Sequence, residues 1–238
     1  MSTILLVRHG QASFGQEDYD VLSPRGEVQA ARLGAHLAAT GQRVDALYVG
    51  PRKRQRDTAA IMARAATERG ASWPAPVERA ELDEYPAELL IRQNFAALVA
   101  GDPGLARALD PATPPAERGA AFERLFEHAM ARWMEGALDT SGLESFAGFI
   151  ERVRAVLDDI VRREGRGRQI LVVSSAGTIS AALGLVLGAR ADVTLRLGYV
   201  MANSAINAIK YRDPRDLTLI SFNALPHLAD DASLITYR

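Results

Sequence analysis

The chain has 238 residues, 48% hydrophobic and 24% charged, with a formal net charge of −1. This composition fits a globular domain with a sizeable core and provides no basic field for nucleic acid or anionic lipid. The absence of cysteine excludes disulfides, thiolate catalysis and cysteine-ligated metal sites. Since no apolar segment has the length of a membrane span or a signal peptide, we expect a cytoplasmic protein without membrane or nucleic-acid partners.

The first part of the chain alternates strand-like apolar runs with helical patterns. Residues 3–7 and 44–49 are predicted as strands, and residues 76–82 as a weaker third strand. Ser23 and Pro24 predict the N-cap and first residue of a helix that ends near Thr40. A second helix is predicted to start at Pro51.

Residues 86–142 interrupt this alternation. They are mainly helical in pattern, with Pro and Gly breaks at residues 102–104 and 113–115. We therefore predict a helical cap at about 86–142, inserted into a single domain that spans residues 1–238. Trp133 is expected to pack within this cap.

The alternation resumes after the insertion. Ser145 is predicted to cap a long amphipathic helix, which is followed by a strand at 169–174, a helix at 176–187 and a strand pair at 205–211 and 217–223. Strands that alternate with helices predict an α/β fold with a mostly parallel sheet.

Polar side chains follow three of the predicted buried strands. They are Arg8, His9 and Gly10 after the first, Arg52 and Arg54 after the second, and Ser175 after the strand at 169–174. The carboxyl ends of parallel strands meet at one edge, where α/β proteins bind ligands. Arginine donors and a helix N-terminus suit phosphate oxygens, and a neutral imidazole is a competent nucleophile toward phosphorus. The strand ends therefore predict a phosphoryl site. The sequence has no Walker motif, so it does not indicate binding of a nucleoside triphosphate.

Simpler interpretations exist for each of these signals. A histidine after a strand is often structural, and an arginine-rich segment is usually a solvated helix face. His36 and His128 lie in predicted helices and are expected to be surface or cap residues. His227 lies in a terminal segment, where we expect a structural role rather than a place in the site. No histidines have metal-ligand spacing, so we expect no metal.

Several segments match motifs of one known family. They are L-V-R-H-G-Q at 6–11, L-S-P-R-G at 22–26, R-Q-R-D-T-A at 54–59, L-D-E at 82–84, G-L-E-S at 142–145 and V-V-S-S-A-G at 172–177, with Asn203, Asn223 and His227. Together they resemble the histidine phosphatase superfamily, which includes cofactor-dependent phosphoglycerate mutases. The resemblance implies a three-layer α/β/α sandwich of the phosphoglycerate mutase-like kind, with no cofactor or metal.

The resemblance also implies roles for individual residues. His9 would be the nucleophile that becomes phosphohistidine, and Arg8 and Arg54 would hold the phosphoryl oxygens. Glu84 would be the general acid and then the general base, with Asp83 as the second choice. Without the resemblance, this acidic stretch is typical of a solvated turn. The phosphate-binding residues would be Arg8, Gly10, Arg54, Ser175 and Ala176.

The chain departs from the family pattern at four positions. Ser175 stands where the family has its second histidine, and Asp57 where R-x-x-Q-T-A has glutamine. Ala12 and Gly15 occupy positions where mutases carry a hydroxyl and an asparagine. Serine donates one hydrogen bond but carries no charge. Losing a preorganised donor costs a factor on the order of 10²–10³ in rate.

We therefore expect a metal-independent phosphomonoester hydrolase with reduced activity. Its substrate would be a phosphorylated small molecule or a phosphoprotein, selected by the cap. The alternative is a non-catalytic phosphate-binding or regulatory protein, and a phosphoglycerate mutase ranks below both. The apolar strands near the C-terminal end are compatible with a homodimer.

Overall fold

The computed structural model describes residues 2–13 and 20–237, so the predicted departure at Gly15 lies outside the described residues. The chain divides into two compact units, Met1–Glu84 with Arg152–Arg238, and Tyr85–Glu151. The predicted insertion at 86–142 lies within the second unit.

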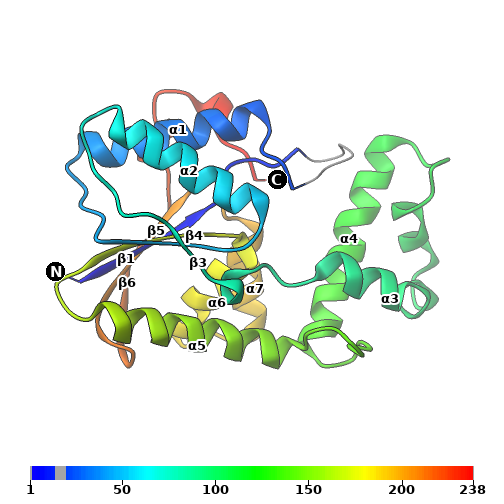
Figure 1. The fold of residues 1–238 in the computed structure, drawn as a ribbon. Coiled ribbons are helices and arrows are strands. Elements are labelled where there is room, and N and C mark those ends of the chain that lie inside the picture. Colours follow the sequence, from blue (N-terminus) through cyan, green and yellow to red (C-terminus); the bar gives the residue numbers. More distant parts are fainter. Residues whose placement is uncertain (1, 14–19, 238) are drawn as a thin grey trace. The chain divides into compact units, whose positions relative to one another are not determined.

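A six-stranded sheet forms the centre of the first unit (Figure 1), in the order β3-β2-β4-β1-β5-β6. Its strands are β1 Thr3–Arg8, β2 Ala46–Val49, β3 Val77–Glu78, β4 Gln169–Ser174, β5 Ile206–Asp213 and β6 Asp216–Ala224. The first four strands in this order are parallel, and β5 and β6 pair in antiparallel fashion. The predicted α/β fold with a mostly parallel sheet is confirmed.

The predicted strand at 76–82 is wrong in its extent. Only Val77–Glu78 pairs with β2, and Ala80–Leu82 forms a 3-10 turn. Its neighbour β2 ends at Val49, opposite Glu78, and Pro51 shortly beyond has no N–H to continue a ladder.

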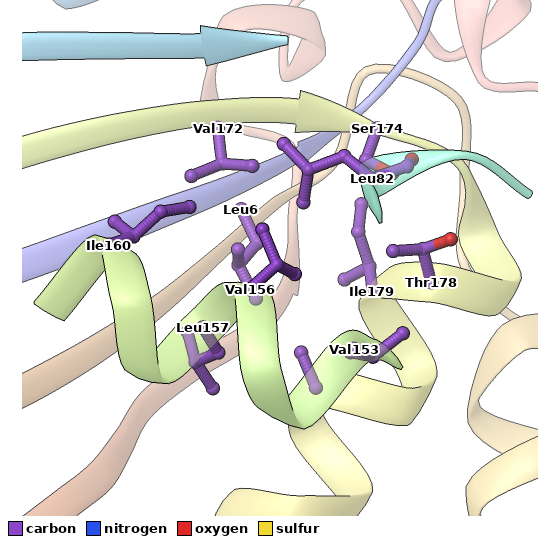
Figure 2. A pocket seen from close by; sticks show the side chains of 11 residues that line it. Leu6, Leu82, Val153, Val156, Leu157, Ile160, Val172, Ser174, Thr178 and Ile179 are labelled. Carbon is purple, nitrogen blue, oxygen red and sulfur yellow. The ribbon is translucent and has the colours of Figure 1, made fainter. Parts of the chain in front are cut away.

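Strand alternation sends side chains to two helical layers. Leu5 and Val7 belong to a core cluster that includes residues of helices α1 and α2. The opposite face, with Leu6 and Val172, packs against helices α5 and α6 around an apolar cavity of about 20 Å³ (Figure 2). The helices are α1 Pro24–Ala39, α2 Lys53–Thr67, α5 Phe146–Glu164 and α6 Ala176–Leu187, followed by α7 Ala191–Tyr199. The first unit therefore has the three predicted layers.

Helix ends follow the predicted signals with one exception. The Ser23 and Ser145 hydroxyls each accept a backbone N–H, from Gly26 and Gly148 respectively, both at 3.1 Å. Helix α2 starts at Lys53 rather than at Pro51. The carboxylate of Asp20 accepts the Lys53 N–H at 2.8 Å and so satisfies one of the orphan donors at this helix start.

The second unit is helical. It contains α3 Ala87–Ala100, a 3-10 segment Pro103–Ala108, α4 Pro115–Met134 and the first turns of α5. Trp133 is 1% exposed, and its ring packs against those of Tyr85, Phe146 and Phe149 at centroid distances of 5.1, 5.2 and 5.7 Å. None of the helices in the described part of the chain has both the length and the apolar character that crossing a membrane requires.

Helices α1 and α2 approach each other so closely that one contact point admits no side chain. A Cβ on Gly34 of α1 would lie 2.1 Å from the carbonyl oxygen of Met62 of α2. We expect Gly34→Ala to lower the free energy of unfolding by about 1–3 kcal/mol, since the backbones have to separate. Denaturant unfolding measures this change.

Gly119→Ala is the matched control. A Cβ there meets nothing within 4 Å on helix α4, so we expect unchanged or higher stability, by up to about 1 kcal/mol. Equal effects of the two substitutions would contradict the close packing of α1 on α2.

Candidate active site

The parallel register of the sheet aligns three strand ends. Val173 of β4 pairs with both Val7 of β1 and Val49 of β2. Just beyond, the His9 N–H donates to the Ser174 carbonyl at 2.9 Å, and the Gly50 N–H donates to the Val173 carbonyl at 3.1 Å. The segments after β1, β2 and β4 therefore leave the sheet side by side, as their polar residues predicted.

His9 is a buried imidazole with both ring nitrogens engaged. Its Nδ1 lies 2.7 Å from the Gly10 carbonyl oxygen, and Arg54 donates its Nε–H to Nε2 at 3.1 Å. Because Nε2 accepts a hydrogen bond, Nδ1 carries the proton of the neutral ring. Burial, and then the charges of Arg54 and Arg8, lower the pKa of His9 well below 6.5. The lone pair of a neutral imidazole is thus held at Nε2.

The backbone around His9 is fixed from the other side of β1. The Ser204 N–H donates to the carbonyls of Arg8 and His9 at 3.1 and 3.3 Å. The side-chain amide of Asn203 also reaches the His9 carbonyl at 3.3 Å. Ser204 adopts φ 58°, which a non-glycine residue rarely does and which turns its N–H toward these carbonyls.

The two predicted phosphate-binding arginines already have partners within the protein. Arg54, 6% exposed, directs Nη1 to the carboxylate of Asp20 at 2.8 Å. Arg8 donates from Nη1 to the carbonyl oxygens of Met201 and Tyr237, the latter at 2.9 Å. Both cations lie near His9, since both lower its pKa. The Asp20 carboxylate thus takes up a donor of Arg54 that the sequence assigned to phosphate.

Gly10 is surrounded by the protein's own groups. Its N–H donates to the Thr58 hydroxyl at 3.0 Å, and a Cβ would lie 2.4 Å from the Gly26 carbonyl oxygen at the start of α1. The packing of α1 is therefore sufficient to require a glycine at position 10, which the resemblance assigned to phosphate binding. Ala176 is the first residue of α6 and is partly exposed.

Glu84 lies at the N-terminus of α6. Its carboxylate accepts the Gly177 N–H at 3.0 Å. Two hydroxyls hold the backbone that leads to it: Ser174 donates to the Leu82 carbonyl at 2.8 Å, and Thr178 to the Asp83 carbonyl at 2.7 Å. Figure 2 shows Ser174, Leu82 and Thr178 at the edge of the apolar cavity. The Ser174 hydroxyl at the end of β4 therefore anchors the segment that carries Glu84.

Asp83, the second choice for the acid, is used in a different way. Its carboxylate accepts from Arg52 Nε at 2.5 Å and from the Glu84 N–H at 2.7 Å. Burial lowers the pKa of Arg52, but the hydrogen bond and charge of Asp83 outweigh it, so the pKa is raised overall. Asp83 thus orients Arg52 and the Glu84 backbone.

Ser175 is 1% exposed, and its hydroxyl accepts from Gln55 Nε2 at 2.8 Å. Neither Gln55 nor Asp20 was singled out from the sequence. Gln55 lies on the buried face of α2 with Arg54 and Thr58, so helical spacing was a signal that could have found it. Asp57, which departs from the family pattern, pairs with Lys53 Nζ at 2.5 Å.

His227 is buried against Ser204, the residue whose N–H holds the Arg8 and His9 carbonyls. Its Nε2 lies 2.8 Å from the Ser204 hydroxyl, and its ring centroid lies 6.4 Å from that of His36. Burial, and then the charges of His36 and Arg32, lower the pKa of His227 to about 4. Residues 2–13 and 20–237 contain no cluster of three or more metal-ligating side chains.

Most of the chain matches a known family. A sequence profile of the Histidine phosphatase superfamily (branch 1) covers residues 4–88 and 112–224. The chain is also 30% identical over 195 residues to a 2,3-bisphosphoglycerate-dependent phosphoglycerate mutase of Thermobifida fusca (strain YX), covering 76% of each chain. The protein belongs to the histidine phosphatase superfamily.

Solved structures share the fold at lower identity. Bacillus stearothermophilus YhfR has a TM-score of 0.65 and 18% identity, covering 96% of this chain and 100% of that one. Mycobacterial glucosyl-3-phosphoglycerate phosphatase Rv2419c, complexed with inorganic phosphate, has a TM-score of 0.63 and 20% identity, covering 95% and 99%. An Entamoeba histolytica phosphoserine phosphatase mutant, complexed with phosphoserine, has a TM-score of 0.62 and 19% identity, covering 96% and 100%.

We expect the His9 ring to stay neutral well below pH 6.5, with its proton on Nδ1. Between the lowered pKa and 6.5, an unfolded chain binds a proton that the folded protein does not, so this group makes stability fall as the pH falls through that range. Arg54→Gln removes a nearby positive charge and should raise the pKa of His9. Nitrogen NMR of the imidazole ring measures both the tautomer and the titration.

Arg56→Gln is the control for this measurement, because Arg56 lies on the same helix but pairs with Glu78 on the exposed side. It should leave the His9 titration unchanged. A His9 ring that titrates near 6.5 in the unmodified protein would contradict the site geometry.

We expect Asp20→Asn to tighten the binding of inorganic phosphate by about two- to fivefold, because the competing charge at Arg54 is removed while a side-chain oxygen still caps α2. Calorimetric titration measures this affinity. Asp57→Asn removes an equal charge from the outer side of α2 and is the control. Weaker phosphate binding in Asp20→Asn would show that Asp20 is needed to orient Arg54.

Proposed function

We propose that this protein hydrolyses phosphomonoesters through a phosphohistidine intermediate on His9, without a metal ion. One observation carries the proposal: a buried, neutral imidazole presents Nε2 beside the guanidinium of Arg54. Membership of the histidine phosphatase superfamily supports it. Phosphatases with the same fold, such as those named above, also support it.

In the first step, Nε2 of His9 attacks phosphorus and the ester P–O bond breaks. The Nε–H of Arg54 stops donating to His9 Nε2 and donates to a phosphoryl oxygen instead. This change frees the Nε2 lone pair for the attack, and the guanidinium neutralises charge in the transition state. The Nδ1 proton stays hydrogen-bonded to the Gly10 carbonyl and supports the positive charge that develops on the ring. Arg54 therefore has to exchange its partners before the attack.

Glu84 handles the protons in both steps. Protonated, it gives its proton to the leaving alkoxide; ionised, it takes a proton from the water that attacks the phosphohistidine. The P–N bond then breaks, and phosphate and neutral His9 are released. The Ser174 and Thr178 hydroxyls hold the segment with Glu84 beside α6, which keeps the carboxylate in place during both steps.

The substrate is proposed to be a phosphorylated small molecule or a phosphoprotein. The second compact unit begins at Tyr85, directly after Glu84 in the chain. We assign substrate selection to this unit, as the predicted cap.

The decisive assay is hydrolysis of p-nitrophenyl phosphate with EDTA present. We expect turnover in the unmodified protein and only the uncatalysed rate in His9→Ala, because that variant has no nucleophile. Labelled substrate should leave an acid-labile phosphoryl group on the unmodified protein and none on His9→Ala. His36→Ala removes a different histidine of the same unit and should retain both properties.

Other results of these assays would support a different function or none. Turnover that survives in His9→Ala would refute the proposal. Phosphate binding without turnover would identify a non-catalytic phosphate-binding protein. Isomerisation of phosphoglycerate, assayed separately because a curated relative is a phosphoglycerate mutase, would identify a mutase.

A further inference from the structure

A buried amide connects the start of helix α2 to Ser175. The side chain of Gln55 is fully buried, its Oε1 accepts the Arg52 N–H at 3.0 Å, and its Nε2 donates to the Ser175 Oγ at 2.8 Å. A backbone N–H can only donate, so the Arg52 contact determines which end of the amide is oxygen. The Nε2 end must then face Ser175.

This orientation decides what the Ser175 hydroxyl can do. A hydroxyl has one proton and two lone pairs, and Gln55 occupies one lone pair as donor. The proton of Ser175 is therefore directed away from Gln55. Ser175 is the N-cap residue of α6 but makes no side-chain capping bond, so its oxygen is not used by its own helix. The neighbouring Ser174 carbonyl accepts the His9 N–H, which keeps this strand end beside the nucleophile.

We propose that Gln55 is a positioning residue that holds Ser175 as a hydrogen-bond donor to the phosphoryl group at His9. The inference rests on the proposed phosphatase function and extends it to Gln55, which acts on the phosphoryl group only through Ser175. Gln55 does not itself touch the substrate and exchanges no proton. Because Gln55 orients the Ser175 hydroxyl in advance, no free energy is spent on fixing a rotating O–H when the phosphoryl group binds. Such preorganisation makes a hydrogen-bond donor effective.

The same amide connects the two sides of the site. The Arg52 N–H that fixes Gln55 stands at the start of α2, two residues before the arginine that contacts His9. A Cβ on Gly50 would lie 2.2 Å from Gln55 Oε1, so the amide is confined there as well. Gln55 therefore has little freedom to release Ser175.

The test is a double-mutant cycle with four proteins: the unmodified chain, Gln55→Met, Ser175→Ala and the double variant. Methionine has a similar size to glutamine but keeps neither hydrogen bond. We expect Gln55→Met to lower kcat and to weaken inorganic phosphate binding by about three- to tenfold when Ser175 is present. When residue 175 is alanine, we expect a change of less than about twofold, because there is no hydroxyl to orient.

Gln55→Glu is the second variant. Its carboxylate still accepts the Arg52 N–H, so the start of α2 is retained, but the other oxygen accepts the Ser175 proton and removes it from the phosphoryl group. We expect a larger loss when Ser175 is present than in the Ser175→Ala background. The repulsion between carboxylate and phosphate is common to both backgrounds and cancels in the cycle. This arm decides the question if Gln55→Met does not fold.

Gln29→Met is the matched control, since Gln29 is another fully buried glutamine that bonds the Gln11 N–H and the Leu234 carbonyl. It should have equal effects in the unmodified and Ser175→Ala backgrounds. Equal effects of the Gln55 variants in both backgrounds would overturn the inference and leave Gln55 a structural residue. A protein that binds phosphate but does not turn over would refute the proposed function alone, because the phosphate affinities of the same four proteins still measure the coupling.

Discussion

The parallel alignment of β1, β2 and β4 is the constraint on which the site depends. Each strand ends within one residue of its neighbour, so the chain leaves the sheet three times at the same edge. The imidazole, the start of α2 and the start of α6 are brought together by backbone ladders rather than by their own attraction. The polar groups can therefore be optimised for chemistry, because the apolar strands and the two helical layers supply the stability.

The resting site is balanced by the protein's own charges and dipoles. Asp20 pairs with Arg54, Asp83 pairs with Arg52, and Glu84 receives an N–H of α6. In the proposed function, a phosphoryl group would thus replace these carboxylates at the donors that it takes over, rather than fill an uncompensated positive pocket. Such an exchange reduces the net electrostatic gain and favours ligands whose geometry matches the donors better than a carboxylate does.

Local patterns predicted most of the fold and the convergence of three strand ends beside His9. Apolar runs gave the positions of β1 and β4, and Ser23 and Ser145 marked helix starts, because these signals depend on neighbours in sequence. The length of the strand predicted at 76–82 was overestimated, because the length of β3 depends on where its neighbour β2 ends. Asp20 follows no periodic pattern, and Gln55 meets a partner 120 residues away in the chain. The contacts of such residues arise only from the tertiary arrangement.

The Gln55 amide, fixed at both ends, also limits which substitutions this part of the site tolerates. The Gln55 amide lies 2.8 Å from the Ser175 oxygen, so a larger side chain that extends from position 175 in this direction clashes with it. Loss of the Ser175 hydroxyl leaves the Gln55 amide without one partner, and loss of Gln55 removes a hydrogen bond from both Ser175 and the Arg52 N–H, which is costly for buried groups. A substitution at one of positions 55 and 175 therefore changes which side chains the other position tolerates.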